Sequence, residues 1–283
     1  MAEPPAHART IAYAGEPGAF AEDAAIGVDR NADRLPVAGF AEVFDAVETG
    51  RAALGVVPIE NLVNGTVREN LDLLLGHDLC VVGEHVVPVR LALAALPGQS
   101  LDEIERVYSH VQALGQAEAF LRSRAWTLLS TYNTAASGKL IADRGERRAA
   151  AVLSPRAAAQ YGLEVLADGI EDVAGNRTRF LVVAARGVPA LAGGSSAARR
   201  TTLAFGVRNE PGTLLTALRA FAEQGVNLSR LESRPSRERA WEYVFWTDAD
   251  ADVDTPDCVA ALEALRAVST FVRVFGSYAR ATD

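Results

Sequence analysis

The stretch G-V-P-A-L-A-G-G-S-S-A-A-R-R, from Gly187 to Arg200, decides how this chain is divided. Glycine, alanine, serine and proline dominate it, and its apolar residues keep neither a helical nor a strand period, which is typical of a linker. The residues before it and the residues after it follow different patterns. We therefore expect a first region over residues 9–186, a linker over residues 187–199 and a second region over residues 200–280.

Before the linker, short apolar runs alternate with helical patterns. Phe40, Val43, Phe44 and Val47 recur at the spacing of one helix face, which predicts an amphipathic helix. Strands that alternate with helices favour an α/β architecture with a largely parallel sheet, and the region is long enough for two lobes. The expected strands cover residues 10–14, 54–59, 81–89, 91–96, 106–109, 127–131, 149–153 and 178–184. The other expected helices cover residues 67–75, 111–124, 134–143 and 155–161.

After the linker the pattern changes to that of a small separate domain of about 80 residues. Pro211 suits the first position of a helix that ends at Gly225, and Thr255 precedes a second helix that runs to Val268. A polar turn is expected over residues 234–239. The expected strands cover residues 201–207, 227–232, 241–247 and 271–278. The resulting order, β-α-β-β-α-β, is the ferredoxin-like split arrangement.

Composition narrows the possible partners. The net charge is −8, and a nucleic-acid partner is not expected because phosphate binding needs a basic face. Cys80 and Cys258 show no metal-ligand spacing, so we expect no metal and no cofactor. No apolar run reaches the length of a membrane span, and the N-terminus lacks an apolar signal core. We therefore expect a soluble, cytoplasmic protein without a membrane partner.

Several turns place polar residues between the end of a strand and the start of a helix. They are Gly15-Glu16-Pro17-Gly18, Ser109-His110-Val111-Gln112 and Asn133-Thr134. In open α/β sheets ligands bind beyond the carboxyl ends of the strands, where helix N-termini attract carboxylates. Plain helix capping explains each turn alone, and capping boxes are expected for Ser109 with Gln112 and for Thr66 with Glu69. Together the turns favour an anion site.

Arg177, Thr178 and Arg179 lie where a loop becomes the last strand of the first region. On a regular strand the two arginines share one face and Thr178 points to the other. Either a bend turns one of them, or only one face contacts a ligand. A surface arginine pair beside Glu171 and Asp172 is the structural alternative, since exposed ion pairs are common and weak.

Two further places in the first region carry candidate polar groups. Glu60 and Asn61 follow the strand that ends at Ile59, where a carboxylate and an amide can orient a hydroxyl or simply form the turn before Asn64-Gly65. His110 is the histidine in a candidate pocket turn, although a loop role explains it equally well.

The second region has two turns that suit an amino-acid ligand. Glu232-Ser233-Arg234-Pro235 ends a strand, and the turn from Asn209 to Leu214 starts a helix. An amino acid needs donors for its carboxylate and acceptors for its ammonium group, and such turns offer both. A polar hairpin that arose by chance is the alternative.

In their order along the chain these motifs resemble those of the prephenate dehydratase family. The motifs are A-G-E-P-G-A-F, G-V-V-P-I-E-N-L-V-N-G-T-V, S-H-V-Q-A-L-G-Q, N-T-A-A, Y-G-L…N-R-T-R-F, N-E-P-G-T-L and L-E-S-R-P. Each is weak alone, but their collinear order is specific, and the resemblance covers about residues 9 to 280. It implies a two-lobed catalytic region like type II periplasmic binding proteins, with the active site between the lobes, and a C-terminal ACT regulatory domain that binds phenylalanine.

The resemblance also implies which residues form the two sites. For the catalytic cleft these are Thr178, Arg179, Phe180, Glu60, Asn61, Ser109, His110, Gln112 and Thr134. For the phenylalanine site these are Asn209, Gly212, Thr213, Leu214, Glu232, Ser233, Arg234 and Pro235. The sequence departs from the family at Ala21, Leu62 and Val111, and these departures alter the polarity of the pocket. It also departs at Thr213, which weakens the expectation that phenylalanine regulates the protein.

From this we expect prephenate dehydratase activity with phenylalanine feedback, in a monofunctional chain that forms a homodimer or homotetramer. Arg179 is the expected anchor for a substrate carboxylate, because a guanidinium fork matches two oxygens. Thr178 is the expected hydrogen-bond donor or relay to the leaving hydroxyl, with Glu60 or His110 behind it. The alternatives are an arogenate dehydratase of the same fold and a non-catalytic amino-acid sensor.

Overall fold

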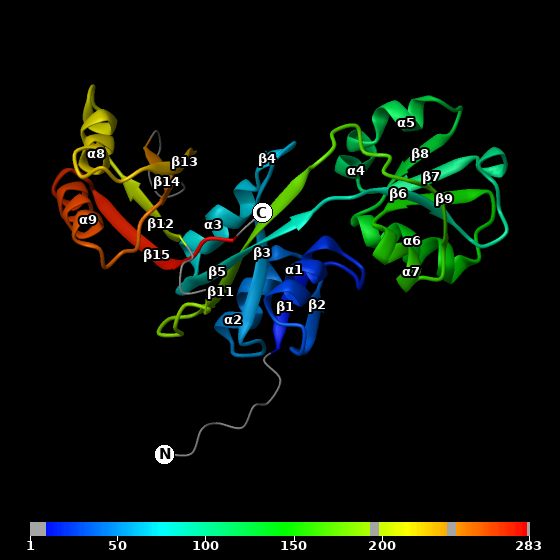
Figure 1. Cartoon of the computed structure of the whole chain (residues 1–283), viewed down its shortest axis with the longest axis horizontal. Coiled ribbons are helices and arrows are strands. Elements are labelled where there is room, and N and C mark those ends of the chain that lie inside the picture. The colour runs from blue at the N-terminus through cyan, green and yellow to red at the C-terminus, as the bar shows by residue number, and fades with distance from the viewer. Residues whose placement is uncertain (1–9, 193–197, 237–241, 282–283) are drawn as a thin grey trace, which may run out of the picture. The chain divides into compact units, whose positions relative to one another are not determined.

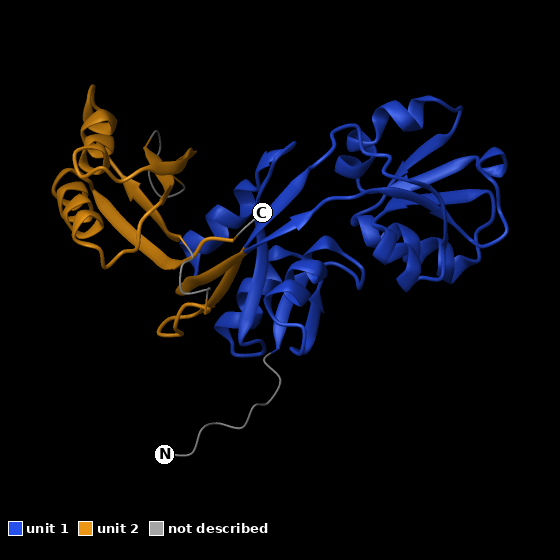
Figure 2. Ribbon diagram, viewed as in Figure 1, with its two compact units in different colours: residues 1–77, 85–180 blue, residues 78–84, 181–283 orange. Residues whose placement is uncertain are grey.

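The computed structural model describes residues 10–192, 198–236 and 242–281. The chain forms two compact units, which Figure 2 colours separately. The first unit comprises the residues up to His77 and His85–Phe180, and the second comprises Asp78–Glu84 and the residues from Leu181 onward. Two long strands, β5 (Leu79–Pro88) and β11 (Arg177–Ala185), therefore belong partly to each unit.

The first lobe is built on a sheet with the strand order β2-β1-β3-β11-β5, with the short β4 paired to β3. Its other strands are β1 (Ile11–Ala14), β2 (Arg34–Val37), β3 (Leu54–Asn61) and β4 (Gly65–Thr66), and its helices are α1 (Phe20–Val28), α2 (Phe40–Glu48) and α3 (Arg68–Gly76). Strand β1 runs parallel to both β2 and β3. The predicted helix at Phe40 is confirmed, since Val43, Phe44 and Val47 are buried on one face of α2.

The second lobe has a mixed sheet with the order β10-β6-β9-β7-β8. Its strands are β6 (Ala92–Ala95), β7 (Arg106–Ser109), β8 (Thr127–Ser130), β9 (Ala149–Leu153) and β10 (Glu164–Asp168). Strand β7 is parallel to β8 and β9, whereas β6 is antiparallel to β9 and β10. The expected largely parallel arrangement is therefore wrong for the pairs that β6 makes with β9 and β10. The chain enters this lobe through β6 and leaves it after β10, and these two strands pair with each other.

Helices cover both faces of this sheet (Figure 1). They are the short 3-10 helix at Leu101–Glu103, then α4 (Val111–Gln116), α5 (Glu118–Arg122), α6 (Thr134–Arg144) and α7 (Pro155–Gln160). Alternate residues of β9 serve the two faces: Ala150 and Val152 belong to the core under α4 and α5, and Ala151 and Leu153 belong to the core under α6 and α7. Such continuous burial is typical of a strand covered on both sides.

The C-terminal domain has the predicted βαββαβ order. Its antiparallel sheet has the order β13-β14-β12-β15, and both helices pack against one face of it. The elements are β12 (Arg199–Gly206), α8 (Thr213–Ala222), β13 (Leu228–Pro235), β14 (Tyr243–Ala249), α9 (Pro256–Val268) and β15 (Phe271–Ala279). Leu203, Phe205, Phe221, Leu262 and Leu265 form the centre of this core.

The single helix expected over residues 111–124 is wrong, because the chain breaks it at Ala117 into α4 and α5. The loop residue Asp172 explains the break. Its backbone N–H donates to the Gln116 carbonyl over 2.7 Å, and its carboxylate accepts from the Ala119 N–H over 3.1 Å. These bonds engage the Gln116 carbonyl at the end of α4 and the Ala119 N–H at the start of α5, which a continuous helix would bond within itself.

The two expected capping boxes do not form among the described residues. Val67 is the N-cap of α3 and has no side-chain cap. Ser109 is fully buried, and its hydroxyl donates to the Val152 carbonyl over 2.6 Å, so His110 caps α4 instead. Helix α8 begins at Thr213 after Gly212 rather than at Pro211.

The polar turn expected over residues 234–239 is only partly described. Arg234 and Pro235 continue strand β13, and residues 237–241 lie outside the described part of the chain, as do linker residues 193–197. No helix in the described ranges is both long and apolar enough to cross a membrane.

Candidate active site

A cavity of about 650 Å³ lies between the two lobes of the first unit, and residues from both lobes line it. From the first lobe come the ends of β1 and β3, the turn at Asn64–Glu69 and the first residues of α1 and α2. From the second lobe come the starts of α4 and α6. The predicted site residues in this lining are Asn61, His110, Gln112, Thr134 and Thr178. The structure therefore brings together polar side chains that lie more than a hundred residues apart in sequence.

The hydroxyl of Thr178 is held by Asn61. Asn61 is 8% exposed, and its Nδ2 donates to Thr178 Oγ1 over 2.9 Å and to the Arg177 carbonyl over 3.2 Å. Its Oδ1 accepts from the N–H groups of Val63 and Asn64. This set of bonds fixes the amide, because both ends of the Asn61 side chain are engaged. Since Thr178 Oγ1 accepts from Asn61, its own hydrogen is available to a ligand in the cavity.

His110 lies in the cavity wall as the N-cap of α4. Its Nδ1 accepts from the Gln112 N–H over 3.4 Å, which leaves the hydrogen on Nε2 when the ring is neutral. Burial lowers the pKa of His110 below its ordinary value. Near neutral pH His110 is therefore a neutral donor rather than an additional cation.

The remaining predicted residues are not among those that line the cavity. Arg179 lies on the opposite face of β11 from Thr178, as strand alternation requires, and its Nη2 lies 3.2 Å from Glu60 Oε2. Phe180 and Ser109 are buried. Arg68, Glu69 and Tyr132 also line the cavity, although the sequence did not predict them as site residues. Glu69 was expected only in a capping box with Thr66, and no motif marked Arg68 or Tyr132.

Three helices of the first lobe begin at the cavity without a side-chain cap. Ala19, Gly39 and Val67 are the N-caps of α1, α2 and α3, and the next residue of each helix lines the cavity: Phe20, Phe40 and Arg68. Helix N-termini carry partial positive charge and N–H groups that attract anions. Arg68 and Glu69 both line the cavity at the start of α3 and carry opposite charges, so the helix N–H groups are the feature that favours a carboxylate at this wall.

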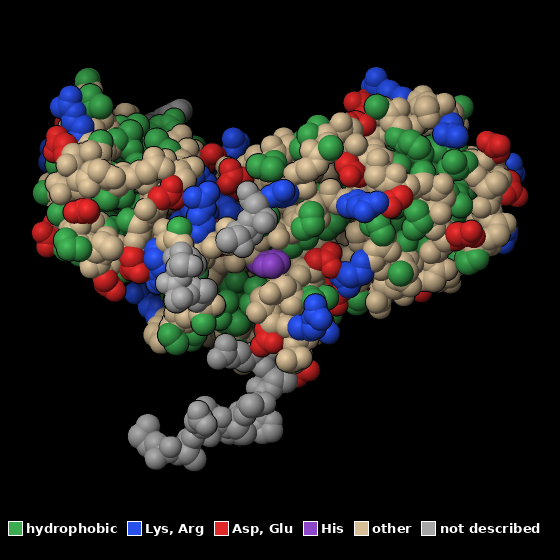
Figure 3. Space-filling model, viewed as in Figure 1, with side chains coloured by type: hydrophobic (Ala, Val, Ile, Leu, Met, Phe, Trp, Pro, Cys, Tyr) green, Lys and Arg blue, Asp and Glu red, His purple; other side chains and the backbone are tan. Residues whose placement is uncertain are grey.

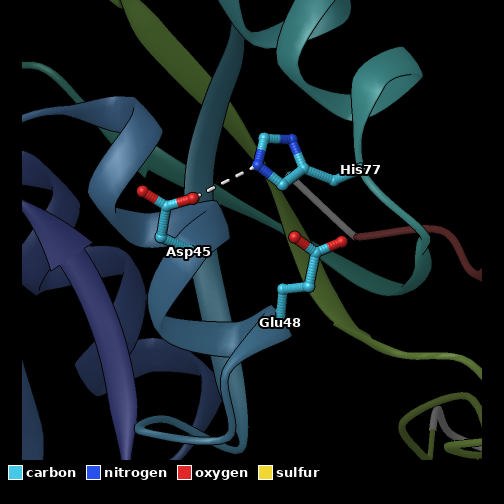
Figure 4. A group of neighbouring side chains, drawn as sticks. All are labelled: Asp45, Glu48 and His77. Atoms are coloured by element: carbon cyan, nitrogen blue, oxygen red, sulfur yellow. Dashed lines mark hydrogen bonds and ion pairs between the residues drawn. The ribbon is translucent and has the colours of Figure 1, made fainter.

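One group among the described residues has metal-ligand character (Figure 4), and none of its members is among the residues that line the cavity. Asp45, Glu48 and His77 bring a ligand atom each within 4.8 Å of one another. His77 Nδ1 lies 2.7 Å from the Leu73 carbonyl, and Nε2 lies 3.5 Å from Asp45 Oδ1. The contacts of His77 with the Leu73 carbonyl and Asp45 account for this arrangement without a metal. The group has no part in the chemistry considered below.

The predicted phenylalanine-site residues lie on two elements of the C-terminal domain. Glu232, Ser233, Arg234 and Pro235 form the end of the edge strand β13. Asn209 to Leu214 form the turn into α8, in which Gly212 has a φ of 86° that favours glycine. The Thr213 hydroxyl donates to the Arg208 and Glu210 carbonyls, so the residue that departs from the family stabilises this turn.

Charged side chains of both signs are interspersed on the face drawn in Figure 3. That face does not present a continuous basic surface among the described residues. A ligand that carries negative charge therefore depends on local features such as the uncapped helix starts described above.

The fold and the cavity define a two-lobed α/β protein that carries a separate βαββαβ domain. Residues 11–187 match the family described as prephenate dehydratase, and residues 201–267 match the ACT domain family. The chain belongs to the prephenate dehydratase family.

Relatives and solved structures agree with this assignment. A bifunctional chorismate mutase/prephenate dehydratase of Aquifex aeolicus is 36% identical over 274 residues, which covers 96% of this chain and 74% of the relative. Arogenate dehydratase 5 of Arabidopsis thaliana is 37% identical over 97% of this chain and 68% of its own length.

Two solved structures match the chain with a TM-score of 0.87 each. A prephenate dehydratase from Arthrobacter aurescens in complex with L-Phe is 34% identical, with coverage of 96% of this chain and 90% of that one. A protein described as a novel type of quorum-quenching acylase, GqqA, is 32% identical over 96% of this chain and 98% of its own.

Proposed function

We propose that this chain converts prephenate to phenylpyruvate by decarboxylating dehydration. The observation that carries the proposal is the position of Thr178, whose hydroxyl oxygen accepts from Asn61 over 2.9 Å in the wall of the cavity between the lobes. The family supplies the reaction class, and this geometry supplies a donor directed at the bound substrate.

The reaction needs one proton and releases two small products. The bond between the ring and its carboxylate breaks, and its electron pair enters the ring. The carbon–oxygen bond to the ring hydroxyl breaks. The oxygen keeps the electron pair of this bond, takes up a proton and leaves as water. The products are carbon dioxide, water and phenylpyruvate, and the new aromatic ring supplies much of the driving force.

Thr178 assists the departure of the hydroxyl. A threonine is a poor acid, so it acts as a hydrogen-bond donor or as a relay for a proton that comes from solvent or through His110. Asn61 keeps the Thr178 oxygen fixed, which aims its hydrogen at the leaving group. Donation of this kind contributes about 10²–10⁴-fold to the rate.

Arg179 stays our proposed anchor for a substrate carboxylate. Its guanidinium is bonded to Glu60 outside the cavity lining in this structure, so the role requires that Arg179 leaves Glu60 and reaches the substrate. Arg68 in the cavity lining is the competing anchor. Arg179→Gln and Arg68→Gln distinguish the two, because loss of the true anchor raises the KM for prephenate by about tenfold or more.

The test of the proposed activity follows the formation of phenylpyruvate from prephenate. We expect Thr178→Ala to lower kcat by about 10²-fold or more, and Thr178→Ser to restore much of it because the hydroxyl returns. Thr216→Ala is the control, since that hydroxyl bonds within its own helix to the Gly212 carbonyl. Wild-type turnover in Thr178→Ala removes Thr178 from the mechanism, and absence of phenylpyruvate with the wild-type protein refutes the activity.

We further propose that phenylalanine inhibits the enzyme through the ACT domain. Ser233→Ala and Arg234→Ala are expected to weaken inhibition by phenylalanine and to leave the basal rate unchanged, because both residues lie on β13 in the second unit. The measurement is the phenylalanine concentration for half inhibition, with calorimetric binding beside it. Unchanged curves in both variants exclude this end of β13 as the effector site.

Arogenate is the second candidate substrate, and relatives named as arogenate dehydratases favour it. Arogenate bears an ammonium group where prephenate has a keto group. Parallel assays give kcat/KM for each acid, and the larger value assigns the substrate. A protein that binds phenylalanine but turns over neither acid is a sensor.

The proposed organisation keeps the boundaries expected from the sequence. Residues 9–186 form the catalytic region, residues 187–199 the linker and residues 200–280 the regulatory domain. We propose that the chain assembles as a homodimer or homotetramer, and light scattering on the purified protein measures which.

A further inference from the structure

The turn Gly15-Glu16-Pro17-Gly18 lies where the two lobes of the first unit meet. It follows β1 of the first lobe, and both glycines have a positive φ, 109° at Gly15 and 93° at Gly18. A Cβ atom at Gly15 would collide with the Asn133 side chain, and one at Gly18 would lie 3.0 Å from the Cβ of Ala157. Both obstructing residues belong to the second lobe. Glycine is needed here for the close approach as well as for the backbone conformation.

The two residues between the glycines are bonded to the second lobe. Glu16 Oε1 accepts from the Tyr132 hydroxyl over 2.7 Å, and Glu16 Oε2 lies 3.3 Å from Lys139 Nζ. The Pro17 carbonyl accepts from the Tyr161 hydroxyl over 2.5 Å. Every residue of this turn therefore approaches or bonds the opposite lobe.

A neighbouring ion cluster extends the same junction. Arg156 at the start of α7 donates to Glu22 over 2.8 Å and to the Ala19 carbonyl over 3.3 Å, and it also pairs with Asp23. Glu22 in turn accepts from the Gly18 N–H over 2.8 Å. The start of α1 is thereby joined to the second lobe over several successive residues.

The junction borders the cavity directly. Gly15 and Tyr132 both line the cavity, whereas Glu16 and Lys139 are not among its lining residues. The hydrogen bond from Tyr132, with support from Lys139, lowers the pKa of Glu16. The carboxylate is therefore ionised throughout the neutral range and keeps both partners.

We propose that Glu16, with Tyr132 and Lys139, forms an inter-lobe clasp that holds the lobes in the arrangement able to bind substrate. These are positioning residues: they set the fraction of molecules whose lobes are correctly placed. When that fraction falls, the apparent dissociation constant rises in proportion, and turnover of the bound complex does not change. The expected rise in the apparent dissociation constant for the substrate rests on the proposed dehydratase function. The expected loss of the lobe arrangement does not rest on it.

The kinetic test uses Glu16→Gln, Tyr132→Phe and Lys139→Met in the full chain. We expect each to raise the KM for prephenate roughly two- to fivefold with kcat unchanged, as for loss of one partly exposed charged contact. Because Glu16 is the shared partner, combining Glu16→Gln with Tyr132→Phe should exceed the larger single effect by less than about twofold. Lys139→Arg keeps the charge and should restore the wild-type KM.

The matched control is Tyr108→Phe. The Tyr108 hydroxyl donates to Glu146 Oε1 over 3.0 Å, so it makes the same kind of tyrosine–glutamate bond within the second lobe. Its KM should stay at the wild-type value. A rise equal to that of Tyr132→Phe would show that the loss of any such bond disturbs the enzyme, and would overturn the clasp.

Amide hydrogen exchange tests the junction independently of the reaction. In Glu16→Gln we expect faster exchange at residues 15–23 and 154–161 together, since both sides of the junction open, and no change in Tyr108→Phe. If the wild-type protein forms no phenylpyruvate, the proposed function fails while this measurement still decides on the clasp. Unchanged exchange at these segments overturns it. So does a KM effect of Tyr132→Phe that Glu16→Gln and Lys139→Met do not share, because Tyr132 would then act by contact with substrate.

Discussion

The ion pair between Arg200 and Glu84 allows a quantitative prediction for the second unit. Arg200 on β12 is 7% exposed and Glu84 on β5 is 1% exposed in their side chains. Arg200 Nη1 donates to both oxygens of Glu84, over 2.9 and 2.8 Å, and the Ala281 N–H donates to Glu84 Oε1 over 2.9 Å. Such a pair is costly to break from one side, because the remaining charge stays buried.

Arg200→Met should therefore destabilise the second unit by about 3–5 kcal/mol. The Glu84 carboxylate would keep the bond from Ala281 but lose its charged partner. Replacing both residues, Glu84→Leu together with Arg200→Met, should cost no more than about 1 kcal/mol, since apolar groups of similar volume often substitute for a buried pair. The coupling free energy between the two positions should then be at least about 2 kcal/mol, because the loss in Arg200→Met alone exceeds the loss in the double variant by that amount.

Urea unfolding of the wild type, both single variants and the double variant measures this coupling. Tryptophan fluorescence is a suitable signal, because Trp246 is buried in the same unit and stacks on Phe275. Circular dichroism recorded in parallel tests whether the two units unfold in one transition or in two. A loss below about 1 kcal/mol in Arg200→Met, or a double variant less stable than either single one, would refute the argument that burial of the Glu84 charge without Arg200 dominates the cost.

Two further predictions concern close packing and pH. Gly276→Ala should destabilise the protein by about 1–3 kcal/mol, because a Cβ there would collide with the Val81 carbonyl. Thermal unfolding measures this loss of stability. Gly76→Ala is the control, since its Cβ would meet nothing within 4 Å. Burial lowers the pKa of His85, so this histidine binds a proton more readily in the unfolded chain than in the folded one. The stability that the neutral histidine allows above about pH 6.5 should therefore be lost as the pH falls through that value toward the folded-state pKa. Unfolding midpoints at pH 5 and pH 7.5 should differ less in His85→Gln than in the wild type, and an equal difference would contradict this role for His85.

The sequence revealed the elements whose apolar faces are strongly periodic. The spacing of Phe40, Val43 and Val47 predicted α2, and the order of patterns after the linker predicted the C-terminal domain. Strands β2 and β10 were missed. Both lie at sheet edges, and their residues are mostly exposed or half-buried. An edge strand buries little, so its sequence carries no clear period, and long-range pairing decides its conformation.

The break between α4 and α5 was missed for a related reason. Local propensity favours a continuous helix there, and the residue that competes for its backbone groups is Asp172, more than fifty positions further along the chain. A capping box at Ser109 failed because the strand before it buries that side chain against the Val152 carbonyl. Both errors arise where tertiary contacts override a local preference.

In the site, too, the sequence pattern predicted some features, and only the fold determined the others. Strand alternation predicted that Thr178 and Arg179 face opposite ways, but it did not say which side carries the cavity. The structure puts Thr178 on that side and Arg179 beside Glu60. The anchor role of Arg179 stays a prediction. No sequence signal connected the G-E-P-G turn to Tyr132, because that contact depends on how the lobes fold together.

An acidic chain that receives a doubly charged acid must create positive potential locally. The net charge of −8 opposes the approach of such a substrate, and His110, with its lowered pKa, adds no positive charge near neutral pH. The uncapped starts of α1, α2 and α3 supply N–H groups and helix dipoles at the cavity, whereas Arg68 and Glu69 bring opposite charges to the start of α3. Backbone N–H groups need no side-chain ordering when a ligand binds, and they stay fixed while charge moves from the substrate carboxylate into the ring. This arrangement explains how a substrate carboxylate can be bound although Arg68 is the one Lys or Arg side chain in the described lining of the cavity.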